Sequence, residues 1–296
     1  MDLLLYCVVR PLIALLQMLP LRVVARLGRA GGAIAYWIDR RHRDVALKNL
    51  TACFGQEKSP AEVRALAKEN FRRLGENYAC AIKTAGMTGE DLQGYVEFTG
   101  IETLCKRIEK SPLRNAVVAI GHFGNFELYA RFNHFLPTVQ GATTYRGLNQ
   151  PSLNRLMQSM REKSGCLFFE RRSGAEQLRS AMEQGGLLLG LLVDQHPGRR
   201  GVLLPFFGRE CFHSAAPAVY ALRYQAALFT AICYRVGLAR WRIETGPEIP
   251  THQAGEPRSI ESITADIAQA FEAAIRRDPA NWFWVHKRWK PTSKNL

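Results

Sequence analysis

The sequence lacks the cysteine patterns that mark disulfide-stabilised and zinc-binding proteins. It holds seven cysteines, an odd number, and no two of them form a Cys-x-x-Cys pair. Closely spaced cysteine pairs are typical of zinc sites, and even sets of cysteines are typical of secreted disulfide frameworks. We therefore expect neither, and we expect a reducing compartment. The cysteines are Cys7, Cys53, Cys80, Cys105, Cys166, Cys211 and Cys233.

The sequence also lacks the features that divide a chain into several domains. It has no low-complexity tract, no linker rich in proline or serine, and no internal repeat. Its 296 residues, 47% of them hydrophobic, suffice for one large domain with a sizeable core. We expect a single α/β domain over residues 21–296, preceded by an apolar segment over residues 1–20.

Acidic residues are too few to balance the basic ones. The chain has 40 Lys and Arg against 26 Asp and Glu, a formal net charge of +14. Such an excess indicates an acidic partner: anionic lipid, a phosphorylated substrate, an acidic carrier protein or nucleic acid. The basic residues are spread along the chain, and no helix-turn-helix, RNP or zinc signature accompanies them. A basic nucleic-acid-binding protein is therefore the less favoured class.

The apolar segment at the N-terminus lacks the marks of a secretory signal. No basic residues precede residues 3–20, and no small-residue cleavage site follows them. As a helix the segment is roughly 27 Å long, about one bilayer thickness. Because Arg10 and Pro11 lie near its centre, we expect a helix kinked at Pro11 that lies in the membrane interface. A helix packed on the domain and a full span are the alternatives. Basic residues near the expected interface are Arg22, Arg26, Arg29, Arg40, Arg41 and Arg43.

Short apolar runs alternate with helical patterns through the rest of the chain. The alternation predicts an α/β sheet covered by helices. Strands are expected over 115–120, 139–145, 166–169, 187–193, 228–235 and 240–245. Helices are expected over 22–50, 59–83, 126–135, 149–164, 174–184, 215–225 and from Ile260 to Ala274, where an Ile/Phe/Ala stripe recurs at helical spacing.

The stretch HFGNFE (122–127) is the most informative in the sequence. It places His122 five positions before Glu127, just after the apolar run 115–120. Gly121 and Gly124 allow a sharp turn, and open α/β sheets often carry their chemistry at such a strand-to-helix turn. We expect Glu127 to reach back to the ring, fix its tautomer and stabilise the imidazolium. A hydrogen-bonded turn histidine without a catalytic role is the alternative.

Three further segments carry candidate functional residues. Asp194 and Gln195 end the apolar run 187–193, where a carboxylate can meet the substrate or the catalytic pair, or simply cap a loop. Leu204, Phe206 and Phe207 lie in a glycine-bounded apolar block, which suits either an acyl-chain groove or plain core. The third segment, WFWVHKRWK (282–290), mixes tryptophans with basic residues. It suits a membrane interface, nucleic-acid stacking or a C-terminal element packed on the core.

Taken in order, these segments resemble the bacterial lipid A biosynthesis acyltransferases, the late lauroyl/myristoyl branch of the lysophospholipid acyltransferase superfamily. RDVALKNLTACFG (43–55) and TTYRGLNQPSLNRL (143–156) join LLVDQ, GVLLPFFGRE, WFWVHKRWK and the histidine motif in carrying the likeness. The resemblance implies a central mixed sheet layered with helices. It also implies the His-x4-acid motif of the superfamily, with His122 as the base and Glu127 as the acid.

The resemblance further implies acyl transfer from an acyl thioester, on acyl carrier protein or CoA, to a hydroxyl of a lipid A precursor. Such a donor is already activated, so a base and oxyanion donors suffice, without a covalent intermediate, metal or cofactor. The backbone amides at Gly124 and Asn125 either help to bind the oxyanion or only form the turn. In relatives the segment matching Tyr145 and Arg146 is associated with substrate binding, and Arg146 suits a phosphate.

The family implies work at the cytoplasmic face of the bacterial inner membrane, with an anionic lipid surface as partner. The sequence leaves open the acyl length and the choice of acceptor. A glycerolipid or aminolipid is the alternative acceptor. Residues 211–214 (CFHS) depart from the small, threonine-rich segment common in relatives, which leaves chain length and acceptor open.

Overall fold

The computed structural model describes residues 2–134, 139–198 and 201–290. Its centre is a mixed sheet, which within these residues has seven strands in the order β1-β9-β8-β2-β5-β3-β4. All neighbouring strands are parallel except β8 and β9, which are antiparallel. The strands are β1 (Val96–Thr99), β2 (Ala116–Ile120), β3 (Gln140–Tyr145), β4 (Leu167–Glu170), β5 (Leu187–Leu192), β8 (Ala227–Gly237) and β9 (Arg240–Thr245).

The central strands follow from their composition. All five residues of β2 are buried, and β5 is an equally apolar run, as expected of parallel strands covered on both faces. The six strands expected from the sequence are therefore confirmed, with ends shifted by at most two residues. Strand β1 was not foreseen, and neither was the separate hairpin of β6 (Val202–Phe206) and β7 (Arg209–His213).

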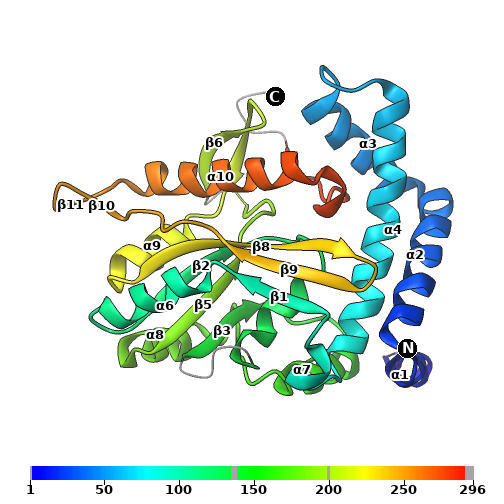
Figure 1. Cartoon of the computed structure of the whole chain (residues 1–296), viewed down its shortest axis with the longest axis horizontal. Helices are drawn as coiled ribbons and strands as arrows, with labels where there is room; N and C mark the ends of the chain where they lie inside the picture. Colours follow the sequence, from blue (N-terminus) through cyan, green and yellow to red (C-terminus); the bar gives the residue numbers. More distant parts are fainter. Residues whose placement is uncertain (1, 135–138, 199–200, 291–296) are drawn as a thin grey trace.

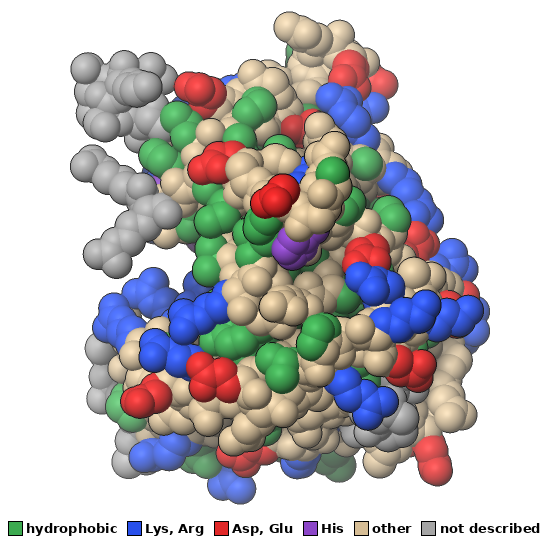
Figure 2. Space-filling view, turned by 90° about the vertical axis from the view of Figure 1, so that its left-hand side faces the viewer, with side chains coloured by type: hydrophobic (Ala, Val, Ile, Leu, Met, Phe, Trp, Pro, Cys, Tyr) green, Lys and Arg blue, Asp and Glu red, His purple; other side chains and the backbone are tan. Residues whose placement is uncertain are grey.

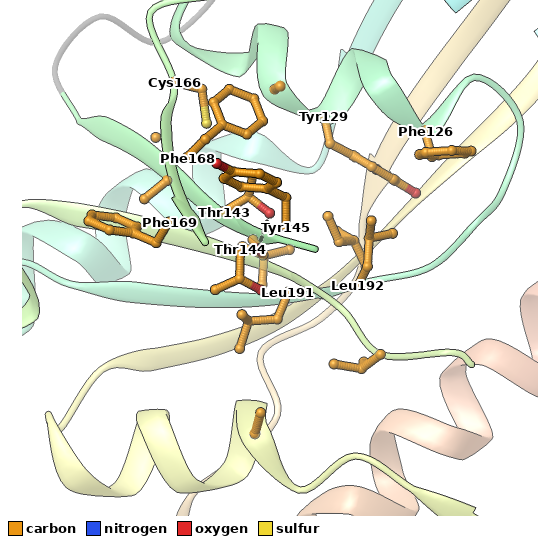
Figure 3. Close-up of a pocket in the computed structure, with 18 of the residues that line it drawn as sticks. Phe126, Tyr129, Thr143, Thr144, Tyr145, Cys166, Phe168, Phe169, Leu191 and Leu192 are labelled. Carbon is orange, nitrogen blue, oxygen red and sulfur yellow. Dashed lines mark hydrogen bonds between the residues drawn. The ribbon is translucent and has the colours of Figure 1, made fainter. Parts of the chain in front are cut away.

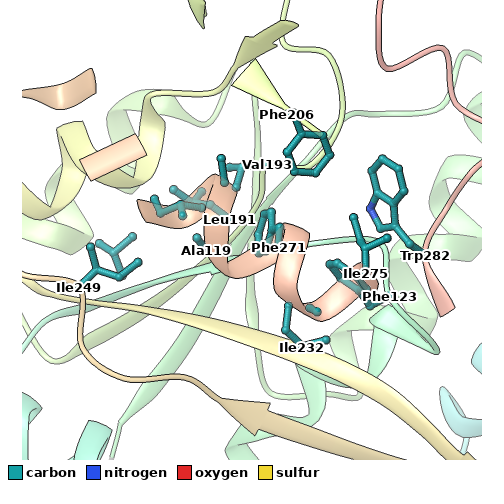
Figure 4. Close-up of a cluster of buried hydrophobic side chains, with 14 of the residues drawn as sticks. Ala119, Phe123, Leu191, Val193, Phe206, Ile232, Ile249, Phe271, Ile275 and Trp282 are labelled. Carbon is teal, nitrogen blue, oxygen red and sulfur yellow. The ribbon is translucent and has the colours of Figure 1, made fainter. Parts of the chain in front are cut away.

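Helices cover both faces of the sheet (Figure 1). One core lies under α8 (Ala175–Gln184), α9 (Ala216–Arg223) and α10 (Ile260–Arg277); the other lies under α6 (Ile101–Lys110) and η1 (Phe126–His134). In the first core, Phe271 and Ile275 of α10 lie over Ala119, Leu191 and Ile232 of the sheet (Figure 4). The expected layered α/β architecture is thus confirmed. The remaining elements are α5 (Gly89–Leu92), α7 (Pro151–Glu162), η2 (Pro279–Asn281) and a separate two-stranded ribbon of β10 (His252–Gln253) and β11 (Glu256–Pro257).

Four helices stand along one end of the sheet (Figure 1). They are α1 (Asp2–Met18), α2 (Leu21–Ile38), α3 (Arg40–Phe54) and α4 (Pro60–Thr84). A capping box between Ser59 and Glu62 starts α4. Glycines let α2 and α4 pack closely, because a Cβ on Gly28 would lie only 2.5 Å from the carbonyl oxygen of Gly75.

The N-terminal apolar segment forms helix α1, which continues through Pro11. Ile13 is buried, and Gln17 is tied to α4 because its carbonyl accepts from Lys83 Nζ at 2.5 Å. Leu12, Leu15 and Met18 are exposed. Among the described residues, no helix combines the length and apolar character that crossing a membrane requires.

A buried carboxylate joins the helical end to the sheet. Glu76 of α4 is fully buried, and its Oε2 accepts from Arg29 Nη1 at 3.2 Å and from Arg235 Nε at 2.8 Å. Its Oε1 accepts from the backbone N–H of Ala239 at 2.9 Å. Helices α2 and α4 and strand β8 therefore share one polar contact inside the protein.

We expect Glu76→Ala to lower the free energy of unfolding by about 3 kcal/mol or more, because it leaves two partly buried arginines and a backbone N–H without their acceptor. The matched control is Glu57→Ala, which removes a half-exposed pair with Arg276 and should cost less than about 1 kcal/mol. Urea unfolding of the two variants measures the difference. Equal losses would contradict the role of Glu76.

Candidate active site

His122 and Asp194 follow adjacent parallel strands at the same edge of the sheet. His122 comes two residues after β2, Asp194 comes two residues after β5, and Ile120 of β2 is paired with Leu192 of β5. Carboxyl ends of parallel strands meet at one edge, so the fold brings the two side chains together. His122 lines a cavity of about 860 Å³ that opens at this edge.

Asp194 binds both the ring and the backbone of His122. Its Oδ1 lies 2.7 Å from His122 Nδ1, and its Oδ2 accepts from the His122 backbone N–H and from Trp282 Nε1, both at 2.8 Å. Burial alone would raise the pKa of the fully buried Asp194 carboxyl. The His122 ring and these hydrogen bonds outweigh that effect and lower the pKa. An ionised carboxylate here accepts the Nδ1–H of His122, which leaves the lone pair on Nε2.

The other side of the ring faces the cavity. Gln195 Nε2 lies 3.4 Å from His122 Nε2, so the amide N–H points at the lone pair. Phe126 and Phe283 flank the ring, with centroids 4.8 and 5.6 Å away. The ring is thus fixed in its plane, and Nε2 remains reachable by a ligand in the cavity.

Glu127 does not occupy the position expected for it. Its Oε1 forms an ion pair with Arg161 Nη2 of α7 at 2.8 Å, while the Nδ1 of His122 is taken by Asp194. The prediction that Glu127 binds the ring of His122 is therefore wrong: Asp194 takes this position. Residues 126–134 form a 3-10 helix, and Phe135 lies outside the described residues. Glu127 still lines the cavity beside His122.

The turn after β2 uses its glycines for backbone geometry. Gly124 has φ +51°, and a Cβ there would lie 2.5 Å from the Cys233 carbonyl oxygen. Its N–H donates to the Asn281 carbonyl at 3.1 Å, so this amide is already used. Asn125 is buried and, like Gly124, is not among the residues that line the cavity. The Gly124 amide, the first of the two donors considered for the oxyanion, is therefore not free to bind it.

Tyr145 and Arg146, at the end of β3, line the cavity as expected of substrate-binding residues. Arg161, which the sequence did not single out, lies over the Tyr145 ring at 5.8 Å while it pairs with Glu127. Together they place a cation, an anion and an aromatic ring on one wall.

The cavity wall comes from both faces of the sheet. It includes the consecutive residues Thr143 and Thr144, Phe168 and Phe169, and Leu191 and Leu192. Consecutive strand residues point to opposite faces, so the cavity passes around the ends of β3, β4 and β5 (Figure 3). An apolar wall of this extent suits a fatty acyl chain.

The apolar block expected to line an acyl groove belongs to the core instead. Phe206 and Phe207 are buried in the β6–β7 hairpin and pack against Trp282 and Trp284. Neither they nor Leu204 line the large cavity. The apolar composition that suggested a groove instead reflects phenylalanines that pack on the core.

The C-terminal tryptophans also belong to the core. Trp282 and Trp284 are buried, so the alternative of a core element is confirmed for this pair. Two amides hold their segment: Asn70 Nδ2 donates to the carbonyls of Ala280 and Trp282, and Asn49 Nδ2 donates to those of Trp284 and His286. His286 and Lys290 of the same segment line the cavity.

Residues 4–291 match the family model described as bacterial lipid A biosynthesis acyltransferase. The chain belongs to this family. It is 28% identical to the lipid A biosynthesis palmitoleoyltransferase of Escherichia coli, over 92% of this chain and 86% of the relative. It is 26% identical to the phosphatidylinositol mannoside acyltransferase of Mycolicibacterium smegmatis, over 82% and 78%. The lauroyltransferase of Escherichia coli is 24% identical, over 93% and 88%.

Family membership makes the chain an O-acyltransferase and confirms the resemblance drawn from the sequence segments. An acyltransferase requires an acyl donor and an acceptor, which must bind side by side. The cavity beside His122, formed by described residues, is large enough for both to be candidates for binding there.

A buried pair next to this site predicts the pH dependence of stability. Arg288 is buried, and its Nη2 donates to His213 Nδ1 at 3.1 Å. Burial, aided by the Arg288 charge, lowers the pKa of His213 from 6.5 to about 3. Between these values the unfolded chain takes up a proton that the folded protein does not bind. Stability contributed by neutral His213 is therefore present above pH 6.5 and is lost as the pH falls toward 3.

We expect His213→Asn, which keeps an acceptor for Arg288 but cannot titrate, to reduce the dependence of the free energy of unfolding on pH between about 6.5 and 4. Urea unfolding across this range measures the slope. The exposed His252→Asn serves as control and should keep the wild-type slope. A slope for His213→Asn as steep as that of the wild type would contradict the assignment.

Proposed function

We propose that the protein transfers a fatty acyl chain from an acyl thioester, carried by acyl carrier protein or CoA, to a hydroxyl of a lipid A precursor or a similar glycolipid. The relatives support this class of acceptor, because those above are named for lipid A and for a phosphatidylinositol mannoside. The observation that carries the proposal is the His122–Asp194 pair, with Nε2 directed into a large and partly apolar cavity.

In the proposed reaction His122 acts as the general base. Nε2 takes the proton of the acceptor hydroxyl as its oxygen attacks the thioester carbonyl carbon. Asp194 keeps Nδ1 protonated and stabilises the imidazolium. The tetrahedral intermediate then expels the thiolate, which takes the proton back from Nε2 and leaves as a thiol. No enzyme nucleophile is needed, so no covalent acyl-enzyme forms.

Gln195 and Arg161 have supporting roles in this proposal. The Gln195 amide, 3.4 Å from Nε2, occupies the place into which the acceptor hydroxyl must move. Arg161 is held by Glu127 against the cavity wall, and with Arg146 it offers cations for a phosphate on the acceptor or on the pantetheine arm of the donor. Glu127 would then act through Arg161 rather than through the ring.

We expect His122→Ala to abolish transfer and Asp194→Asn to lower kcat roughly 10²-fold or more, because the latter loses the tautomer and the counter-charge. Glu127→Gln should lower kcat less than Asp194→Asn. Mass spectrometry of a lipid A precursor incubated with acyl donor and purified enzyme measures one added acyl chain. The control is His252→Ala, remote from the cavity. Wild-type turnover by Asp194→Asn, or a larger loss in Glu127→Gln, would contradict this division of roles.

We also propose that α1 and α2 rest on the cytoplasmic face of the inner membrane. Leu12, Leu15 and Met18 are exposed on α1, and α2 exposes both apolar side chains such as Trp37 and basic ones such as Arg22. Apolar and basic side chains on one helical pair suit an anionic lipid surface. The opposite end of the sheet differs, because there Lys and Arg lie in several separate groups with acidic side chains among them (Figure 2).

We expect Leu12→Ser combined with Leu15→Ser to weaken binding to anionic phospholipid vesicles, because two apolar contacts are removed without changing charge. The binding that remains should fall as salt is raised, since it depends on the basic residues. Vesicle co-sedimentation at low and high salt measures both effects. Val219→Ser combined with Val236→Ser, two exposed apolar positions elsewhere, is the control. Equal binding by the two double variants would contradict the assignment of α1.

A further inference from the structure

Transfer through a tetrahedral intermediate requires a hydrogen-bond donor for the oxyanion inside the cavity. The amide of Gly124 does not meet this need, because it donates to Asn281. His122 offers no donor either: its backbone N–H and Nδ1 are both engaged by Asp194. The donor must therefore come from another wall of the cavity.

His286 carries a donor on that wall, fixed by its surroundings. The backbone N–H of His196 donates to His286 Nε2 at 3.1 Å. A backbone amide can only donate, so Nε2 must be the unprotonated nitrogen. A neutral ring held in this way carries its proton on Nδ1. The segment itself is held by Asn49, which binds the His286 carbonyl at 2.8 Å.

The Nδ1–H group of His286 forms no hydrogen bond within the described part of the chain. Its nitrogen is not among the fully buried atoms without a partner there, so it retains some exposed surface. The ring is half-buried and lines the same cavity as His122. A donor that has no protein partner and borders the cavity is available to a ligand.

The surroundings also keep this ring neutral. Burial lowers the pKa of His286 to about 4, and the positive groups Lys290, Arg288 and His122 act in the same direction against Asp194. A neutral imidazole can donate to an oxyanion without losing its proton. Lys290, which also lines the cavity, adds positive potential at this wall.

We propose that His286 is a catalytic residue whose Nδ1–H donates a hydrogen bond to the carbonyl oxygen of the thioester. This inference rests on the proposed function. As the acceptor oxygen bonds to the carbonyl carbon, the π electrons of the carbonyl group move to the carbonyl oxygen. His286 stabilises the negative charge that forms on that carbonyl oxygen. When the carbon–oxygen double bond forms again, the carbon–sulfur bond breaks. The thiolate then takes the proton held by His122 Nε2, and His286 keeps its own proton throughout.

Two substitutions separate this role from a purely structural one. His286→Asn places an amide N–H where Nδ1 lies but removes the acceptor for His196. His286→Gln places an amide oxygen where Nε2 lies and removes the Nδ1 donor. We expect His286→Gln to lower kcat roughly 10²- to 10³-fold with little change in KM, as for loss of one oxyanion donor. We expect His286→Asn to retain at least about a tenth of the wild-type kcat.

The measurement is the steady-state rate of acyl transfer to a lipid A precursor, with His252→Gln as the matched control and thermal unfolding as the check of folding. Three outcomes would overturn the inference and assign His286 to holding residues 195–198. They are a wild-type kcat in His286→Gln, an effect of that substitution on KM rather than on kcat, and a higher activity in His286→Gln than in His286→Asn. Equal loss of kcat in both variants would also overturn it. If the wild-type protein transfers no acyl chain while it is folded, the proposed function fails instead.

A second readout does not depend on activity. Nitrogen NMR of the histidine rings in the intact protein distinguishes the two neutral tautomers, and His286→Gln assigns the signal. We expect the proton on Nδ1 of His286 at neutral pH. A protonated Nε2 would overturn the inference whatever the kinetics.

Discussion

The buried carboxylate of Asp194 is the contact on which the rest of the site depends. It accepts three hydrogen bonds, two from His122 and one from Trp282. These bonds join the end of β2, the end of β5 and the C-terminal segment at one point. An ionised group is stable there only because every donor is in place, so the fold and the tautomer of the base are set by the same interaction.

The C-terminal segment reaches this point because polar side chains of the N-terminal helices hold it. Asn70 of α4 and Asn49 of α3 bind four carbonyls between Ala280 and His286. Trp282 and Trp284 fill the space between these helices and the β6–β7 hairpin. Residues more than 200 positions away in the sequence therefore hold the segment from which His286 and Lys290 line the cavity.

Much of this arrangement could be predicted from the sequence, because it depends on local patterns. The apolar runs predicted β2 and β5, and His122 and Asp194 meet because these two parallel strands are neighbours in the sheet. The partner of the ring could not be predicted from spacing. Glu127 is nearer in sequence, but it lies on a 3-10 helix beside Arg161 of α7, and no local pattern reveals that pairing.

The apolar block with Phe206 and Phe207 was predicted to line an acyl groove, and it shows that composition does not reveal what a side chain contacts. Phe206 and Phe207 have the composition of an acyl groove, yet in the hairpin they face Trp282 and Trp284 rather than the cavity. Composition records that a side chain avoids water, and it does not record whether protein or ligand covers it. The cavity wall could not be predicted for a further reason: it combines short runs from β3, β4 and β5, which are separated in the sequence and share no continuous signature.

The glycine contact between α2 and α4 has a consequence for how the enzyme would sit on lipid. With no side chains between them at Gly28 and Gly75, the backbones of the two helices are in direct contact. From α4 an unbroken series of contacts leads through Asn70 to the backbone of Trp282, and from its indole to Asp194 and His122. A continuous series of contacts thus connects the helices that bear the exposed apolar side chains to His122. If α1 and α2 rest on the bilayer, the depth of that contact sets the height of His122 above the headgroups, and with it which hydroxyl of an embedded acceptor comes within reach.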